Sequence, residues 1–193
     1  MTAAIVLAGG RASRLGGADK ANLQIDGQPL INAVYASLAE AHPVIAVGPE
    51  SIAHPGVTVV QEEPPFGGPV AGLAAAFVEL DGILDAAAEV WVLACDLPRA
   101  ALIVAQLREI PTPEAADAVI LRDAGGRDQW LAGRYRIASL RSALDSLPDV
   151  RDVSMRLLVA GLNLYGVDDR LGATEDLDTW DDVAQYQHEE DHS

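Results

Sequence analysis

Short apolar runs alternate with longer segments of helical periodicity along most of this chain. The apolar runs are rich in β-branched residues and end at glycine, proline or acidic residues, which is typical of buried strands. The strands expected on this pattern are residues 3–8, 44–47, 57–60, 89–96, 118–122, 129–136 and 162–167. Strands that alternate with helices predict an α/β protein whose central sheet is mostly parallel.

Helices are predicted where regularly spaced apolar residues follow a proline or a strand end. The helical segments expected are residues 29–41, a segment from Pro69, a segment from Pro98, and residues 137–147 and 155–160. A glycine turn at Gly125 and Gly126 separates two strand patterns, which predicts a small antiparallel insertion around residues 125–136. We therefore predict one doubly wound, Rossmann-like sheet with this insertion.

The composition favours a single domain. The chain has 193 residues, of which 50% are hydrophobic, and no linker separates two regions of different composition. We expect the domain to span residues 1–187 and residues 188–193 to form a polar tail. The tail sequence HEEDH matches the HExxH pattern of zinc proteases, but it lies in a highly polar run at the chain end, so we interpret it as a solvated, frayed terminus.

Charge and cysteine content narrow the partners and the compartment. The formal net charge of −16 argues against nucleic-acid or anionic-membrane surfaces, and no apolar run approaches the roughly 20 residues that cross a bilayer. The apolar N-terminus lacks a preceding basic region, which favours a strand over a signal peptide. The single Cys95 excludes an internal disulfide and fits a reducing cytoplasm, and we interpret it as a small buried side chain rather than a nucleophile.

The loop LAGGRASRLGGADK, residues 7–20, has the composition of an anion site. Its glycines let backbone N–H groups approach a phosphate closely, while Arg14 and Lys20 add positive charge. Lys20 is the only lysine among 13 basic residues, and an ammonium group is a compact point charge suited to one anionic oxygen. The loop lacks both the Walker and the GxGxxG spacing. The alternative interpretation is a plain strand-to-helix turn.

Acidic residues follow two further predicted strands. Glu62 and Glu63 come after residues 57–60, and Asp96 ends the strand at 89–96. Parallel sheets bind ligands beyond the carboxyl ends of their strands, so these groups and the first loop should share one edge. Mg²⁺ prefers one or two carboxylates together with substrate phosphates, which makes Asp96 a candidate ligand. Alternatively, Asp96 caps the helix expected at Pro98.

Three ordered motifs resemble the nucleotidyltransferase family that includes molybdenum-cofactor guanylyltransferases. They are the first loop, GGPVAGL at residues 67–73 and LACDLP at residues 93–98, with RDQWLAGRY, VSMRLL and DLDTWDDV as supporting stretches. The resemblance implies a Rossmann-like nucleotidyltransferase fold and a nucleotide site comprising Leu7, Ala8, Gly9, Gly10, Lys20, Glu62, Gly68 and Asp96. It also implies that Asp96 binds Mg²⁺. Glu63 remains an alternative to Glu62.

The resemblance implies transfer of GMP from GTP to the phosphate of molybdenum-bearing molybdopterin, with release of pyrophosphate. Arg14, Lys20 and Asp96 would be the catalytic residues. The alternatives are a related enzyme that uses CTP or another acceptor, and a regulator that binds nucleotide without catalysis. We expect a monomer that makes at most transient contacts with proteins that deliver or receive the cofactor.

The sequence departs from the family pattern at four positions. Leu15 replaces a usual methionine, which conserves volume. Trp130 and Trp180 stand where the family tends to have proline, and Asp178 stands where it usually has asparagine. The changes at Asp178 and Trp180 blur the assignment of the second substrate's pocket, and they leave open whether Asp178 or Asp176 is a second metal ligand.

Overall fold

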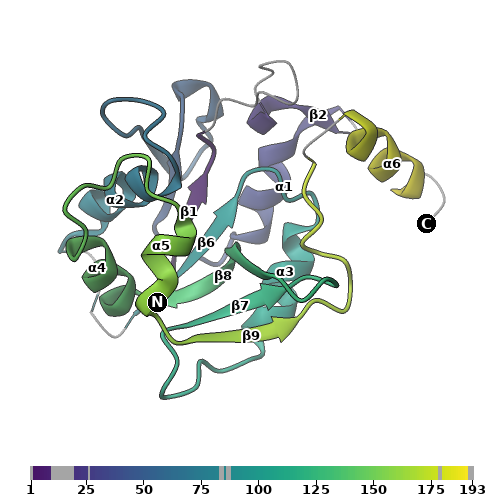
Figure 1. The fold of residues 1–193 in the computed structure, drawn as a ribbon. Helices are drawn as coiled ribbons and strands as arrows, with labels where there is room; N and C mark the ends of the chain where they lie inside the picture. Colours follow the sequence, from purple (N-terminus) through teal and green to yellow (C-terminus); the bar gives the residue numbers. More distant parts are fainter. Residues whose placement is uncertain are drawn as a thin grey trace.

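A seven-stranded sheet in the order β5-β4-β1-β6-β8-β7-β9 forms the centre of the molecule (Figure 1). The computed structural model describes residues 2–9, 20–25, 27–82, 85, 88–177 and 180–190. The strands of the sheet are β1 (Thr2–Leu7), β4 (Val44–Val47), β5 (Val57–Val60), β6 (Glu89–Ala94), β7 (Ala118–Arg122), β8 (Asp128–Arg136) and β9 (Leu164–Asp168). The predicted fold class is confirmed.

One strand runs against the rest of the sheet. The strand β1 pairs in parallel with β4 and β6, and β7 pairs in parallel with β9, whereas β8 lies antiparallel between β6 and β7. The carboxyl ends of the parallel strands therefore share one edge with the amino end of β8. This is the antiparallel insertion expected from the glycine turn, and it places residues 123–130 at the edge where ligands of such sheets bind.

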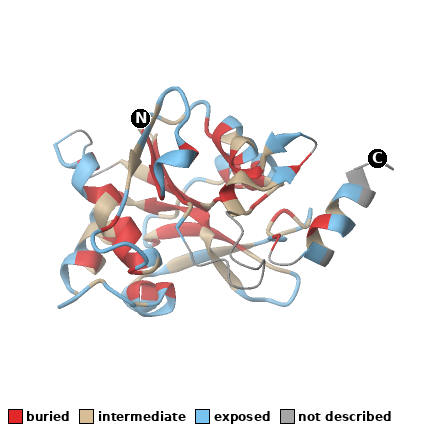
Figure 2. Ribbon diagram, turned by 90° about the horizontal axis from the view of Figure 1, so that it is seen from above, coloured by how far each residue is buried: buried red, intermediate tan, exposed pale blue. Residues whose placement is uncertain are grey.

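Helices cover both faces of the sheet, as Figure 1 shows, with α1 and α3 on one side and α2, α4 and α5 on the other. Their bounds are α1 (Leu30–Ser37), α2 (Pro69–Leu80), α3 (Ala100–Arg108), α4 (Ile137–Asp145) and α5 (Met155–Leu158). Short 3₁₀ turns add η2 (Lys20–Asn22), η3 (Glu50–Ile52) and η4 (Val159–Gly161). The helices bury their apolar faces against the strands, which makes the sheet the most buried layer (Figure 2).

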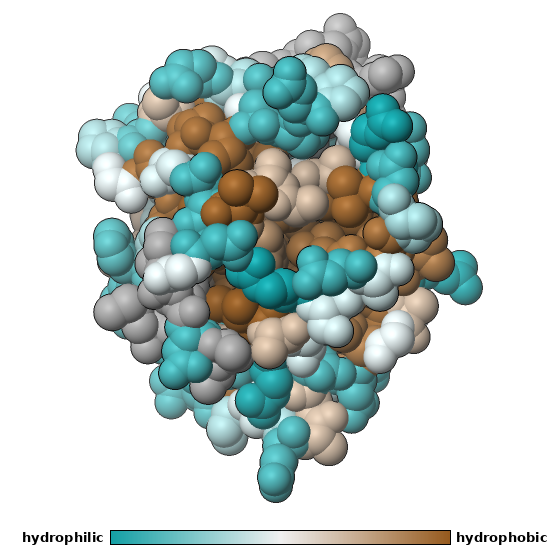
Figure 3. All heavy atoms as spheres, turned by 90° about the vertical axis from the view of Figure 1, so that its left-hand side faces the viewer, coloured by the Kyte–Doolittle hydropathy of each residue, from teal (hydrophilic) through white to brown (hydrophobic). Residues whose placement is uncertain are grey.

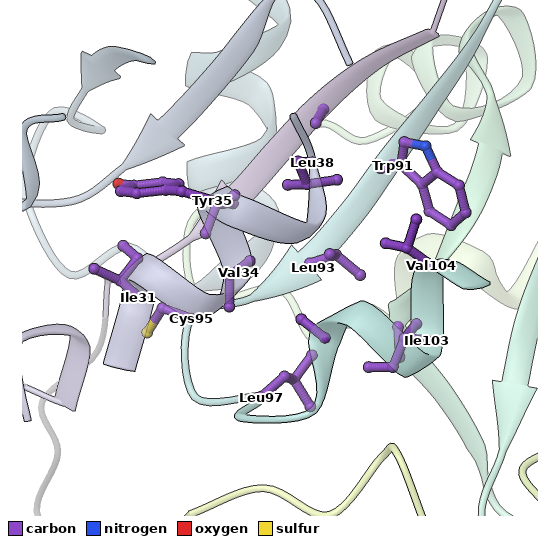
Figure 4. Packing of buried hydrophobic residues seen from close by; sticks show 14 of the residues in the cluster. Ile31, Val34, Tyr35, Leu38, Trp91, Leu93, Cys95, Leu97, Ile103 and Val104 are labelled. Atoms are coloured by element: carbon purple, nitrogen blue, oxygen red, sulfur yellow. The ribbon is translucent and has the colours of Figure 1, made fainter. Parts of the chain in front are cut away.

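Two apolar cores result, one on each face of the sheet. Figure 4 shows the first, in which Val34 of α1 and Ile103 of α3 pack around Leu93 of β6. Cys95 is buried in this core, which agrees with its interpretation as a small apolar filler. The second core lies beneath α2, α4 and α5. The solvent-facing surface of these helices carries hydrophobic patches between polar side chains (Figure 3). Val78 of α2 and Leu157 of α5 are exposed there.

A third, smaller cluster attaches two elements that the sequence analysis did not predict. These are the two-stranded antiparallel sheet β2 (Gln24–Ile25) with β3 (Gln28–Pro29), and the helix α6 (Trp180–Glu190). Ile25 and Leu30 pack there against Leu177 and Val183. The helix α6 includes the first three residues of the expected polar tail.

Several element bounds differ from the prediction. Strands at 44–47, 57–60 and 118–122 lie where expected, but the helix expected at Pro98 begins at Ala100 and the helix expected to reach residue 41 ends at Ser37. Both differences lie at helix ends, where local sequence specifies structure least. Within the described residues, no helix combines the length and apolar character that a membrane span requires.

Candidate active site

The first loop leaves the sheet at its predicted edge. The carbonyl of Leu7 accepts a hydrogen bond from the N–H of Cys95 at 3.0 Å, and the N–H of Ala8 donates to the carbonyl of Val47 at 2.8 Å. These bonds hold the end of β1 between β6 and β4, and the chain reaches the surface at the exposed Gly9. Gly10 and Arg14 lie outside the described residues, so their roles remain predictions.

Lys20 and Asp96 contact one another. The Nζ atom of Lys20 donates to Oδ2 of Asp96 at 3.1 Å, and the two side chains are 18% and 17% exposed. Lys20 begins η2, whose Ala21 is buried in the first core, so the turn is anchored beside the end of β6. The structure thus brings together two of the residues predicted for the site.

Asp96 does not cap the following helix. The helix α3 begins at Ala100 with Arg99 as its N-cap, and no side chain accepts a hydrogen bond there. Oδ1 of Asp96 has no hydrogen-bond partner within the described residues, while its backbone carbonyl accepts from the N–H of Leu177 at 3.2 Å. The capping alternative is therefore wrong, and one carboxylate oxygen is available to a ligand.

The two glutamates after β5 differ in orientation. Glu62 is buried, and its Oε1 accepts a hydrogen bond from the N–H of Phe66 at 2.9 Å. The same oxygen lies 3.8 Å from the position that a Cβ atom would take at Gly9, whereas Glu63 is exposed. The contact with the Gly9 segment favours Glu62 over Glu63 as the nucleotide contact.

Glycines bring α2 close to this edge. Gly68 precedes the helix with φ of 89°, a conformation that side chains disfavour. A Cβ at Gly72 would lie 3.2 Å from Cγ1 of Val47 and 3.3 Å from Cδ2 of Leu7, closer than ordinary packing distance. The helix therefore packs tightly on β1 and β4, and its amino end lies near the segment that carries Glu62.

A cleft of 1460 Å³ lies beside Asp96. Its walls come from the turn after β6, the β7–β8 hairpin, α5, the β9–α6 loop and α6. The residues that line it include Asp96, Trp130, Arg156, Asp169, Arg170, Asp176, Leu177 and Tyr186. This cleft could not be predicted from the sequence, because its walls come from segments far apart in the chain. Trp130 and Asp176, however, lie in stretches that the family resemblance had already singled out, RDQWLAGRY and DLDTWDDV.

Seven carboxylates and three arginines line the cleft, together with aromatic side chains. Hydrogen bonds to Asp123 from the backbone N–H and the side chain of Arg127 keep the pKa of this carboxyl low, and they fix the hairpin tip. Arg156 and Arg170 line the cleft, and neither has an ion-pair partner within the described residues. Trp130 and Tyr186 add aromatic rings. The arginine and aromatic side chains of this lining can contact the phosphate and the ring of a flat molecule, while the acidic majority gives the cleft a net negative charge.

The acidic groups suit magnesium better than a metal that needs several protein ligands. The described residues contain no group of three or more histidine, cysteine or acidic side chains that could hold a metal ion. Mg²⁺ requires only one or two carboxylates when substrate phosphates complete its shell. Asp96 meets that requirement, and Asp176 lines the same cleft. Asp178 lies outside the described residues.

Two relatives are similar to this chain in sequence. The molybdenum cofactor guanylyltransferase of Serratia proteamaculans is 38% identical over 101 residues, which cover 49% of this chain and 48% of that protein. A probable molybdenum cofactor guanylyltransferase of Nostoc is 35% identical over 153 residues, which cover 74% of this chain and 69% of that protein. The chain thus spans about half the length of the Serratia relative.

A solved structure extends the likeness over the whole chain. The molybdopterin-guanine dinucleotide biosynthesis protein A of Archaeoglobus fulgidus superposes with a TM-score of 0.71, with 19% identity and complete coverage of both chains. At this identity the comparison establishes the fold. Residues 4–161 match the family described as the MobA-like NTP transferase domain, and this chain therefore belongs to that family.

Proposed function

We propose that this protein transfers GMP from GTP to the phosphate of a molybdopterin acceptor that carries molybdenum, and releases pyrophosphate. The contact between Lys20 and Asp96 is the observation that carries the proposal. It lies between the segment of Gly9 and Glu62 on one side and the cleft on the other. A donor nucleotide and an acceptor placed on these two sides would meet at Asp96.

The donor side suits a purine that offers hydrogen-bond donors. Oε1 of Glu62 accepts from Phe66, and Oε2 has no hydrogen-bond partner within the described residues. The Watson–Crick edge of guanine presents an N–H and an amino group, both donors, and a carboxylate is an acceptor. Backbone groups around Gly68 would complete the base pocket. We therefore assign the selection of guanine to Glu62 together with this backbone.

The acceptor side suits a flat heterocycle with a phosphate. Arg156 presents a guanidinium with no ion-pair partner in the described part of the chain, and such a group binds phosphate oxygens in pairs. Trp130 offers a ring on which a pterin can stack. The tryptophan replaces a proline that is usual in the family, so this chain would hold its acceptor by more aromatic contact.

The reaction needs positioning more than acid–base catalysis. An acceptor phosphate oxygen, already ionised near neutral pH, attacks the α-phosphorus of GTP. A new P–O bond forms, the bond to the β-phosphate oxygen breaks, and its electron pair leaves with pyrophosphate. Lys20 neutralises charge on the phosphates, and the amide of Gly9 adds a donor. Mg²⁺ bound through Asp96 would supply further charge neutralisation.

Pyrophosphate release and product mass test the proposal together. The protein is incubated with Mg²⁺, molybdenum-bearing molybdopterin and each of the four ribonucleoside triphosphates in turn. Release with GTP, and a product heavier than the acceptor by one GMP unit, are the expected results. A higher rate with CTP than with GTP would contradict the proposal and would indicate that the enzyme transfers CMP. Nucleotide binding without any release would indicate a regulator, against which the retained Lys20 and Asp96 pair argues.

A further inference from the structure

Asp169 accepts four side-chain and backbone hydrogen bonds at one wall of the cleft. Its Oδ1 accepts from Nε2 of Gln106 at 3.2 Å and from the N–H of Leu171 at 3.1 Å. Its Oδ2 accepts from the N–H and the hydroxyl of Thr174 at 2.8 and 2.9 Å. Partial burial raises the pKa of Asp169, but these bonds outweigh that effect and the pKa is lowered. The carboxylate therefore stays charged and saturated with donors.

This network shapes one wall of the cleft. Asp169 directly follows β9, and its partners Leu171 and Thr174 lie in the loop that leads to α6. The loop carries the guanidinium of Arg170 and the carboxylate of Asp176 along the cleft. Within its described residues, the loop has no regular pattern of backbone hydrogen bonds of its own. The carboxylate of Asp169 therefore fixes the path of the loop by accepting hydrogen bonds from its backbone N–H groups.

The far part of the same loop is tied to the turn that carries Asp96. The N–H of Leu177 donates to the carbonyl of Asp96 at 3.2 Å. Arg99, three residues beyond Asp96, donates to the carbonyl of Gly172 at 3.3 Å and to Oε2 of Glu175 at 2.8 Å. The loop is therefore fixed at its start by Asp169 and along its later part by the Asp96 turn.

We propose that Asp169 is a positioning residue, which sets the β9–α6 wall of the acceptor cleft at a fixed place relative to Asp96. This inference rests on the proposed function, because it assigns the cleft to the acceptor. Asp169 does not need to touch the acceptor. It acts through the loop, so its loss should disturb acceptor binding while the segments of Gly9, Glu62 and Gly68 keep their place.

The test compares Asp169→Asn with Asp168→Asn. In Asp169→Asn, an NH₂ group replaces one of the two carboxylate oxygens. The two donors that contacted that oxygen therefore lose their acceptor. Asp168, one residue earlier, is exposed and makes no side-chain hydrogen bond in the described part of the chain, so the control removes the same charge. For Asp169→Asn we expect the KM for the acceptor to rise about tenfold or more while the KM for GTP stays within about twofold. Asp168→Asn should change neither value.

Hydrogen exchange tests the same positioning without relying on activity. Peptides covering residues 170–177 should exchange faster in Asp169→Asn, and the increase should include the Leu177 amide that binds the Asp96 carbonyl. Unchanged exchange, or equal increases of both KM values, would overturn the inference. If wild-type protein transfers no nucleotide, the proposed function fails while the exchange result still decides the positioning role. Thr174→Val, which removes a single hydroxyl donor, should give a smaller effect in the same direction if Asp169→Asn folds poorly.

Discussion

The ammonium nitrogen of Lys20 lies 3.1 Å from a carboxylate oxygen of Asp96, so the only lysine of the chain pairs with the aspartate expected to hold magnesium. The pair joins residues 76 positions apart and is largely shielded from solvent. Oδ1 of Asp96 has no hydrogen-bond partner within the described residues, so the carboxylate can contact a third, charged partner beside the ion pair. We expect triphosphate to be that partner.

Replacing Lys20 by alanine should remove a charge-assisted contact to the phosphates. Such contacts contribute about 1.5 to 3 kcal/mol, so kcat/KM for GTP should fall about 10- to 150-fold. Lys20→Arg should restore only part of the activity, because the planar guanidinium cannot reproduce a compact point charge. Steady-state pyrophosphate release measures both variants. Turnover of Lys20→Ala within twofold of wild type would exclude this role.

Replacing Asp96 by asparagine should weaken the dependence on magnesium. An amide binds Mg²⁺ less well than a carboxylate, so the Mg²⁺ concentration that gives half-maximal rate should rise at least about tenfold. A magnesium titration of the rate at saturating GTP measures the change. Asp85→Asn changes the charge equally at a position away from the cleft and serves as control. An unaltered titration in Asp96→Asn would remove Asp96 from the metal site.

Replacing Glu62 by glutamine should relax the choice of base. Glutamine can still accept the hydrogen bond from the N–H of Phe66, so the turn should persist, but its amino group would face the donors of guanine. We expect the preference for GTP over ATP to fall by about 1 to 3 kcal/mol. Competition between the two nucleotides for one protein sample measures the preference. Glu63→Gln is expected to leave it intact, and the reverse result would transfer the role to Glu63.

Asp117 should make stability depend on pH in the acid range. The hydroxyl of Ser139 donates to its Oδ1 at 2.6 Å and the N–H of Asn163 to its Oδ2 at 2.8 Å. The hydrogen bond from Ser139 is the main cause of the lowered pKa of this carboxyl. Since the pKa is lower in the folded state than in the unfolded state, the contribution is complete above the unfolded value and disappears as the pH falls through the folded one.

Asp117→Asn should therefore lower the free energy of unfolding at pH 7 by about 1 to 2 kcal/mol. The difference from wild type should shrink at pH 3 and below. Denaturant unfolding at both pH values measures it, and Asp145→Asn, an exposed position near the end of α4, is the matched control. A difference that is the same at pH 7 and pH 3 would contradict the assignment.

The edge of the sheet at which Gly9, Glu62 and Asp96 lie could be predicted from sequence because its signals are local. In the sequence, an apolar run followed by glycine or by an acidic residue indicates where a strand ends. Parallel strands place their carboxyl ends at the same edge of the sheet. Gly9, Glu62 and Asp96 all follow this rule. Lys20 and Asp96 contact one another, although nothing in either segment specifies the pair, and their roles in the site stay predictions.

The cleft and α6 could not be predicted because their signals are weak or distant. In α6, Val183 is buried and Tyr186 only partly so, and the helix packs on a cluster whose other members lie at residues 23–30 and 177. The hydrogen bonds to Asp169 depend on the path of the loop after β9, and no residue spacing in the sequence predicts that path. One signal was available, since Asp169 is an acidic residue two positions beyond the strand predicted at residues 162–167.

The position of β6 divides the chain as well as the sheet. Gly9, Lys20, Glu62 and Gly68 precede Asp96 in the sequence, whereas the hairpin, α5 and the β9–α6 loop that line the cleft all follow it. On the proposed assignment, the donor and acceptor contacts come from opposite halves of the chain. We therefore expect substitutions before residue 96 to alter mainly the KM for GTP, and substitutions after it to alter mainly the KM for the acceptor.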